Sequence, residues 1–517
     1  MKKAYIFIGI CIFLVVFISS VLTVVDYGIT WDEPIHISYI LHQVDWLNSP
    51  HPFSENTIKN IWCFEAHPPL VKYVISVGLL LLHKSVGILY ASRIPMCLLF
   101  SLLITAVYFF SLRYYDIHAA IFSSLALFLM PRVFAHGHFA VYDIPIALAW
   151  FVVCWAFIKG TSSLKWSIFV GLISGLALLT KENSVFLIIP LLFWGQIYRR
   201  KFYWRNTLFI LLLSPIVLIA LWQGLWYDPF SNIIKFYMYH VKHNPVNVFY
   251  LGKTYGAQIA PWHYPFILLA TTVPPATLLL STYGVQIYIR KHFKDKISGM
   301  VVINILFLLI LMSLPIAQKY DGIRLFMPIF PFLAVLAGIG FSELYKRIST
   351  YAKTHKFLAN GLYILLLPAL ITLVRIHPYQ TSYYNMFIGG IRGAHKLGME
   401  TTYWGDCITE KTMEFINNNT QENGRVIFYP VGSFVPRYYK EMGLLRKDIK
   451  IAGIGDEDFD YLILLSRQGM FNDKVWEIYK HRLPVYEVSY QGVPIVKIYK
   501  KSDICGIISN VKLSTKG

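Results

Sequence analysis

The sequence predicts an α-helical polytopic membrane protein with about eleven transmembrane helices, followed by a small α/β domain outside the membrane. Of its 517 residues, 56% are hydrophobic and 15% are charged, which is too apolar for a soluble protein of this size. The apolar residues form long blocks, and Lys and Arg stand in short clusters between these blocks. The net charge of +19 therefore reflects the positive bias of cytoplasmic loops, and no nucleic-acid partner is expected.

The first apolar run, residues 4–25, follows Lys2 and Lys3. A signal peptide is the alternative, but the run is long and lacks a convincing small-x-small cleavage site. We expect a first spanning helix, with Asp32 emerging on the outer side. Residues 26–90 then form the first outer loop. Within it the apolar stretch 71–82 is too short to cross a hydrocarbon core of ~30 Å, so it is predicted to be a juxtamembrane helix.

Ten further apolar runs complete the count by the rule of ~20 residues per span, with two short runs as exceptions. They are residues 94–112, 119–134, 143–157, 168–179, 185–197, 208–226, 265–289, 300–316, 325–341 and 357–374. With the N-terminus inside, every dense basic cluster falls on the cytoplasmic side. The same alternation places Asp32, Glu65, His67, Asp143 and Lys181 on the outer face, which indicates an external active site.

Residues 376–517 are more polar and are predicted to form the extracytoplasmic α/β domain, which leaves residues 1–375 as the transmembrane domain. Residues 425–429 and 461–465 have the pattern of strands, and residues 484–499 that of a hairpin turning at Gln491-Gly492. Residues 409–417 and 473–479 are predicted helices. The six cysteines show no metal-binding spacing, and Cys407 and Cys505 either pair with each other or remain free thiols.

The stretch of residues 28–39 places two adjacent carboxylates, Asp32 and Glu33, beside Trp31 and Pro34 at the mouth of the first span. Ionisable groups are costly near hydrocarbon, so carboxylates at this depth suggest a function. The alternative is that Asp32 is a polar loop residue that caps a following helix.

Several motifs, in their order along the chain, resemble those of the polyprenyl-phosphate-sugar glycosyltransferases. That superfamily includes the dolichyl-phosphate-mannose protein mannosyltransferases and the bacterial aminoarabinose transferase of lipid A. Trp31-Asp32-Glu33-Pro34 resembles the acidic pair after the family's first span. The run from His67 to Lys72, His-Pro-Pro-Leu-Val-Lys, is similar to the mannosyltransferases' His-Pro-Pro-Leu-Gly-Lys.

Further motifs extend the resemblance to about residue 400. Tyr142-Asp143-Ile-Pro is similar to the family's second acidic position, and the run from Gly175 to Lys181 resembles its Gly-x-x-x-x-Thr-Lys. Residues 261–264 and 377–390 resemble patterns of bacterial members. Residues 376–517 show no strong match to the carbohydrate-reading domain of the eukaryotic protein mannosyltransferases. The resemblance implies a GT-C-type fold.

The resemblance also implies a reaction. A sugar would pass from a polyprenyl-phosphate donor to a hydroxyl or phosphate acceptor on a lipid, glycan or protein, at the outer face of the plasma (inner) membrane. Asp32 would be the base, as its counterpart in the mannosyltransferases is. Asp143 would orient the acceptor or polarise Asp32, and Glu33 completes the catalytic set. The chemistry is consistent with this, because an attacking hydroxyl needs a base and a departing phosphate needs cations or a metal.

The remaining candidates divide into two groups. Residues expected to bind the donor phosphate are Lys72, Lys181, Arg93 and Arg324. Residues expected to contact the acceptor or the sugar are Trp31, Glu65, His67, His136, His138 and Tyr142. The alternatives are local: Lys181 snorkels to the interface, Arg324 pairs with Asp321, His67 shapes the Pro-Pro turn, and His136 and His138 are polar lining. Whether a divalent metal takes part is left open.

Two other classes of function stand as alternatives to an enzyme. In a secondary transporter, Asp32 and Asp143 would be the coupling carboxylates. Against this, the acidic groups gather at one face rather than at the midplane, and a sizeable outer domain follows. A non-catalytic scaffold would have little reason to place acids and cations at helix mouths.

Overall fold

The computed structural model describes residues 2–62, 67–199, 201–241, 246–351 and 356–508. Within these residues, seven helices are long and apolar enough to cross a membrane. They are α1 (Lys3–Thr23), α5 (Ile88–Tyr114), α8 (Asp143–Gly160), α11 (Tyr203–Leu221), α15 (Lys296–Ser313), α16 (Ile329–Tyr351) and the stretch Leu358–Ile376 that ends in α18 (Leu367–Ile376). The prediction of an α-helical polytopic membrane protein is confirmed.

The remaining predicted spans are short or bent. Three are short apolar helices: α6 (Ile117–Phe128), α9 (Leu164–Leu178), and the stretch Glu182–Ile197, which holds η1 (Glu182–Leu187) and α10 (Ile188–Ile197). The run 265–289, predicted as one span, is instead α13 (Tyr264–Thr272) and α14 (Pro275–Arg290), which meet at 119°. Pro274 and Pro275 have no backbone N–H to continue the helix. The Asn385 side chain donates to the carbonyls of Ala270 (2.7 Å) and Val273 (2.8 Å) and so provides hydrogen-bond partners for backbone groups at the break.

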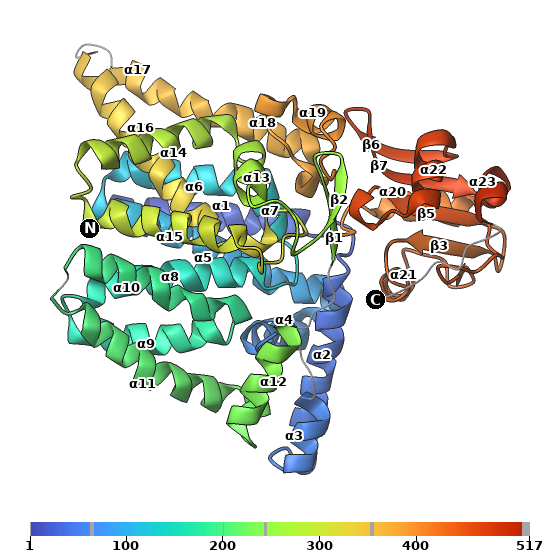
Figure 1. The fold of residues 1–517 in the computed structure, drawn as a ribbon, viewed down its shortest axis with the longest axis horizontal. Coiled ribbons are helices and arrows are strands. Elements are labelled where there is room, and N and C mark those ends of the chain that lie inside the picture. Colours follow the sequence, from blue (N-terminus) through green and yellow to red (C-terminus); the bar gives the residue numbers. More distant parts are fainter. Residues whose placement is uncertain (1, 63–66, 200, 242–245, 352–355, 509–517) are drawn as a thin grey trace.

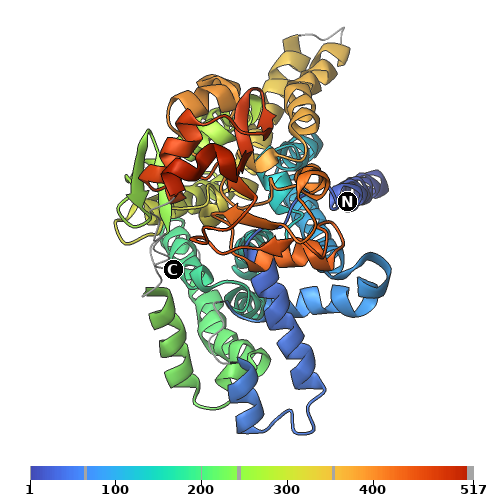
Figure 2. The ribbon, with the colours of Figure 1, turned by 90° about the vertical axis from the view of Figure 1, so that its right-hand side faces the viewer.

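Several helices lie across one end of the bundle rather than along its axis (Figures 1 and 2). They are α2 (Asp32–Leu47), α3 (Glu55–Trp62), α4 (Leu70–Val86) and α12 (Pro229–Val241). α4 covers the stretch predicted to be a juxtamembrane helix. The rest of the predicted outer loop contains α2 and α3, so Asp32 begins a helix. Thr30 and Glu33 form a reciprocal capping pair there: the Thr30 amide donates to Glu33 Oε2 (3.0 Å), and the Glu33 amide donates to Thr30 Oγ1 (3.3 Å).

The α/β domain contains a five-stranded sheet of order β4-β3-β5-β7-β6. Its strands are β3 (Arg425–Tyr429), β4 (Lys450–Ile451), β5 (Tyr461–Leu465), β6 (Tyr486–Tyr490) and β7 (Val493–Lys500). β3 pairs in parallel with β4 and β5, whereas β7 runs antiparallel to β5 and β6. The helices are α20 (Glu410–Asn419), α21 (Phe434–Glu441), α22 (Asp473–His481) and α23 (Lys501–Ile508). β3, β5, the hairpin of β6 and β7, and the helices α20 and α22 coincide with the sequence prediction, whereas β4 was not predicted.

The α/β domain lies at the end of the bundle that α2 crosses, whereas the start of α1, the C-terminal ends of α10 and α16 and the start of α11 lie at the opposite end (Figure 1). Basic residues of the sequence stand at or next to these helix ends, so they and the α/β domain are on opposite sides of the bundle. Two linking elements, the hairpin β1 (Asn247–Tyr250) to β2 (Lys253–Gly256) and α19 (Gly390–Lys396), were not predicted. Cys407 is a buried free thiol.

Candidate functional site

A cluster of three carboxylates surrounds Arg324 at the junction of the helix bundle and the α/β domain. Arg324 Nη2 lies 2.6 Å from Asp32 Oδ2, and Nη1 lies 2.8 Å from Asp321 Oδ2. Its Nε lies 3.6 Å from Asp143 Oδ2. Asp32 begins α2, Asp143 begins α8, and Arg324 begins the short helix η3 (Arg324–Phe326). Residues far apart in the sequence thus converge on one guanidinium.

Asp143 is held from all sides. Its Oδ1 accepts a hydrogen bond from Lys181 Nζ at 2.9 Å, and its Oδ2 lies 3.2 Å from His136 Nδ1. The other nitrogen of His136 meets the Tyr403 hydroxyl at 3.2 Å. The Asp143 side chain is 0% exposed. A buried carboxylate whose two oxygens both bind protein groups is suited to positioning its neighbours.

Asp32 has a different environment. Its side chain is 21% exposed, and its Oδ2 accepts hydrogen bonds from Arg324 and from Trp404 Nε1, the latter at 3.0 Å. Its Oδ1 accepts no hydrogen bond from any residue that the structure describes. Burial alone would raise the pKa of Asp32, but the Arg324 charge, the neighbouring His36 and the Trp404 hydrogen bond outweigh it and hold the pKa below its usual value. Asp32 is therefore an ionised carboxylate with one oxygen held and one available.

Glu33, the next residue, forms a buried ion pair with Arg93. Arg93 Nε donates to Glu33 Oε1 (2.6 Å) and Nη2 to Oε2 (2.7 Å), and both side chains are 0% exposed. The guanidinium also donates to the carbonyls of Val24, Tyr27 and Gly28, and the Ala140 amide donates to Glu33. The structure therefore does not bring Glu33 and Arg93 to the cluster around Arg324. Their atoms instead fix the turn between α1 and α2.

Three further predicted residues, His67, Tyr142 and Lys72, lie near Asp32 together with His36, which was not predicted. His36, one helical turn after Asp32, and His67 both pack against the Tyr142 ring, with centroids 4.7 and 4.3 Å away. His67 Nδ1 lies 2.8 Å from Glu182 Oε2, and the buried Lys72 donates to the His67 carbonyl at 3.1 Å. Aromatic rings and a cation thus line the side of Asp32 that faces α4.

The segment after the last span supplies three residues that sequence reasoning missed. Arg467, directly beyond the end of β5, pairs with Asp321 at 2.6 Å and lies 4.4 Å from the Trp31 ring. It also donates to the Tyr403 carbonyl. The Trp404 ring lies 4.3 Å from the Arg324 guanidinium. No local sequence pattern predicts these contacts, because Asp321 and Arg467 are 146 positions apart in the sequence.

Backbone contacts between the α1–α2 turn and residues 404–408 fix the position of Asp32. The Gly28 amide donates to the Asp406 carbonyl (2.9 Å), and the Trp31 amide donates to the Trp404 carbonyl (3.2 Å). A side chain at Gly28 would collide with the Ile408 carbonyl and come within 2.8 Å of the Asp406 carbonyl. The turn needs glycine there because two backbone segments approach so closely.

His138, a further predicted residue, does not take part in this arrangement. His138 contacts the Phe134 carbonyl (2.7 Å) and Thr23 Oγ1 (2.9 Å), so it joins α1 to α7 (Pro131–His136) rather than the cluster. Glu65 lies outside the described residues. Within those residues, no three His, Cys, Asp or Glu side chains are grouped in a way that could hold a metal ion.

Comparison with known proteins agrees with this architecture. Residues 66–227 match the family model described as dolichyl-phosphate-mannose-protein mannosyltransferase. That segment includes the His67–Lys72 motif, Asp143 and Lys181. No curated protein matches the chain.

The fold is similar to that of ArnT from Cupriavidus metallidurans in two crystal structures. The structure with undecaprenyl phosphate bound superposes with a TM-score of 0.52 and 13% identity, covering 96% of this chain and 98% of that one. The apo structure gives a TM-score of 0.53 and 14% identity, covering 98% and 99%. At such identities the likeness shows the fold. The family model thus supports the resemblance seen in the motifs over residues 66–227, and the likeness to ArnT shows a shared fold over nearly the whole chain.

Proposed function

Proceeding from this likeness of sequence and fold, we propose that the chain is a membrane glycosyltransferase that moves a sugar from a polyprenyl-phosphate donor to an acceptor hydroxyl. The reaction takes place at the end of the bundle that carries the α/β domain, which we assign to the extracytoplasmic face of the plasma membrane. A reporter fused after Gly390 should accordingly read as extracytoplasmic. The acceptor belongs to a lipid, a glycan or a protein.

The available Oδ1 of Asp32 is the observation that carries this proposal. The acceptor oxygen forms a bond to the anomeric carbon and transfers its proton to Asp32. The bond from that carbon to the donor phosphate breaks, and the lipid phosphate leaves with the electron pair. The lowered pKa of Asp32 supports the role, because the base must be ionised before the acceptor attacks. Arg324 and Trp404 hold Oδ2 and so fix the direction of Oδ1.

The other residues divide between charge and position. Lys72 and Lys181, both buried at the same end of the bundle, are assigned to the negative charge of the departing phosphate. Arg324 already has three carboxylate partners and is assigned to holding Asp32 in place. Asp143 is assigned to positioning Lys181 and Arg324, and also to orienting the acceptor.

Two of the predicted sugar- or acceptor-contacting side chains are assigned to the substrate side of Asp32. His67 and Tyr142 line that side and are assigned to the sugar or acceptor. Trp31 is only partly buried, but Arg467 lies against its ring, so its stacking on a sugar would require the other face. His136 is assigned to Asp143, its hydrogen-bond partner, rather than to the substrate.

The test is transfer by an Asp32→Asn variant, which keeps the shape and removes the proton acceptor. A positioned base contributes typically ~10²–10⁴ in rate, so turnover of a polyprenyl-phosphate sugar should fall at least by the lower figure, while donor binding persists. Asp26→Asn is the matched control, since Asp26 lies just before the same turn, is 44% exposed and pairs with His377. Asp143→Asn should also reduce turnover, mainly through use of the acceptor. A folded Asp32→Asn protein that binds donor and transfers sugar at the wild-type rate would refute the assignment.

A further inference from the structure

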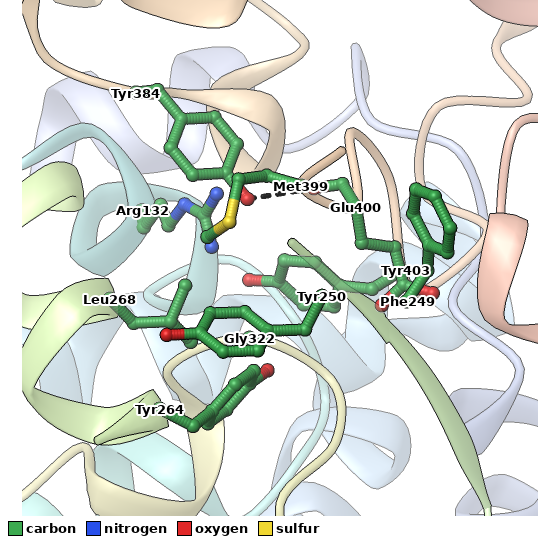
Figure 3. Close-up of a pocket in the computed structure, with 10 residues that line it drawn as sticks. All are labelled: Arg132, Phe249, Tyr250, Tyr264, Leu268, Gly322, Tyr384, Met399, Glu400 and Tyr403. Carbon is green, nitrogen blue, oxygen red and sulfur yellow. Dashed lines mark hydrogen bonds between the residues drawn. The ribbon is translucent and has the colours of Figure 1, made fainter. Parts of the chain in front are cut away.

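A small cavity lies beside Tyr403, the residue whose hydroxyl meets His136 (Figure 3). Arg132 from α7, Tyr250 from β1, Tyr264 from α13, and Tyr384 and Glu400 from the segment after α18 line it. Its volume of about 10 Å³ is roughly the space of one water molecule. A tetrahedral phosphate with four oxygens is too large for this space.

The charge of Arg132 is not neutralised by a nearby carboxylate. The residue is 1% exposed, and among the described residues no carboxylate oxygen lies within 4.0 Å of its guanidinium. Its Nε donates to the Tyr383 carbonyl at 2.9 Å, but its Nη2 has no hydrogen-bond partner in the described part of the chain. Buried charges are ordinarily paired, because an unpaired one loses its hydration without compensation. Arg93, Arg324 and Arg467, also buried here, each contact a carboxylate within 2.8 Å.

The groups around the Arg132 guanidinium reduce the free-energy cost of burying it but do not neutralise its charge. The Tyr384 and Tyr403 rings lie 4.6 and 5.5 Å from Arg132 Cζ, which stabilises a cation but leaves the net charge in place. Glu400 lines the same cavity, but its carboxylate accepts a hydrogen bond from the Gly469 amide at 3.0 Å. Burial raises the pKa of Glu400 to about 7, so near neutral pH it carries only part of a negative charge.

We propose that this cavity binds one monatomic monovalent anion such as chloride, with Arg132 Nη2 as its charged donor and the surrounding side chains shifting slightly to admit it. A water molecule would satisfy the hydrogen bond but leave the buried charge uncompensated. A halide would accept the hydrogen bond and also compensate the positive charge. Gly322, in the loop that also carries Asp321, keeps the space open. A Cβ there would come within 2.9 Å of Arg132 Nη1 and 2.7 Å of the Tyr403 ring.

An anion bound here would stabilise the position of Tyr403, and through it the cluster around Arg324. The Tyr403 ring packs on Arg132 while its hydroxyl meets His136, the partner of Asp143. Binding of the anion requires neither the sugar donor nor the acceptor and is therefore independent of the proposed transfer reaction.

The first experiment compares thermal unfolding of the purified full chain in sodium chloride and in sodium gluconate at equal ionic strength. The wild type should melt roughly 1–3 °C higher in chloride, with saturation as chloride replaces gluconate. Arg132→Gln should lose this difference. Arg425→Gln, at a partly exposed arginine of the α/β domain that pairs with Asp456 and Asp458, should keep it. Equal melting of the wild type in both salts, or the full chloride effect in Arg132→Gln, would overturn the proposal.

A second measurement uses the wild type alone and so does not depend on the folding of the variant. Crystals soaked in sodium bromide should show an anomalous difference peak between Arg132 and the surrounding tyrosine side chains. Bromide peaks confined to other places, or no peak at all, would overturn the proposal.

Discussion

Asp32 and Glu33 are adjacent carboxylates with opposite surroundings. Glu33 has no exposed surface, and both of its oxygens bind Arg93 and backbone amides. Asp32 is partly exposed, with Oδ2 held and Oδ1 without a partner among the described residues. A saturated carboxylate stabilises the fold, and a half-held one is available for chemistry. An acidic pair in a sequence motif therefore need not be a catalytic pair, because successive positions of a helix face different neighbours.

The largest expected effect comes from breaking the Glu33–Arg93 pair. Removing one partner of a buried ion pair leaves the other charge uncompensated and costs about 3–5 kcal/mol. Glu33→Ala should therefore lower the thermal stability of the purified protein sharply, whereas Asp32→Asn should change it by less than ~1 kcal/mol. The double replacement Glu33→Met with Arg93→Met should recover part of the loss, because no buried charge remains. A Glu33→Ala protein as stable as Asp32→Asn would remove the distinction drawn between the two residues.

Glu400 is a third kind of buried carboxylate, with a pKa raised to about 7 by burial. Its folded-state pKa lies above the ordinary value of 4.5, so the folded state holds the proton more tightly than the unfolded state does. The contribution of protonated Glu400 to the free energy of unfolding is fully present below pH 4.5 and is lost as the pH rises through about 7.

Replacing Glu400 by Gln should flatten this part of the pH profile, removing a change of order 2–3 kcal/mol in the free energy of unfolding. Thermal melts of both proteins from pH 4.5 to 8, at constant chloride, measure it. Parallel profiles for the two proteins would show that Glu400 ionises as readily in the folded state as in the unfolded one.

Arg467 tests whether the α/β domain contributes to the cluster. Arg467→Met removes a charged partner of Asp321 and should reduce transfer by roughly 10–100-fold, since the removed charge-assisted hydrogen bond is worth about 1.5–3 kcal/mol. Arg467→Lys should recover part of that loss, and the KM for donor should change little. Arg425→Met is the control within the same domain. If Arg467→Met transfers sugar normally, the cluster works without the α/β domain.

Lys181 gives the smallest expected effect. It donates to Asp143 and is assigned to the donor phosphate, so Lys181→Ala should weaken donor binding by about tenfold. Lys159→Ala, at the other end of α8, should bind donor as the wild type does. Both variants and the wild type should bind the free polyprenyl alcohol equally, since it has no phosphate. Wild-type affinity of Lys181→Ala for the donor would leave the lysine with a purely structural task.

The fold was largely predictable because membrane spans and short strands have local signatures. Each predicted apolar run coincides with a helix or a bent helix pair, and β3 and β5 occupy their predicted residues. The outer loop was less predictable, because α2 carries no long apolar run. The capping pair of Thr30 and Glu33, which marks the start of α2, was not part of the sequence prediction. The bend at Val273–Pro274 depends on Asn385, more than a hundred positions away.

The candidate site was predictable only in part. Asp32, Asp143 and Lys181 stand in motifs at helix starts, and the topology brought them to one face. The structure gathers the first two around Arg324 and pairs the third with Asp143. Arg467 and Trp404 could not be foreseen, because their positions depend on how the α/β domain packs on the bundle. Which carboxylate is saturated likewise depends on tertiary contacts, such as that of Arg93 with the Glu33 side chain.

The backbone contacts of Gly28 with residues 404–408 bear on the order of events during biosynthesis. While a ribosome has released only the helices of the membrane bundle, the Gly28 amide has no Asp406 carbonyl to bind and Asp321 has no Arg467. The turn that aims Asp32 is completed only when the last quarter of the chain has emerged and folded onto the bundle. A nascent or prematurely ended chain would therefore be inserted in the membrane yet remain chemically silent.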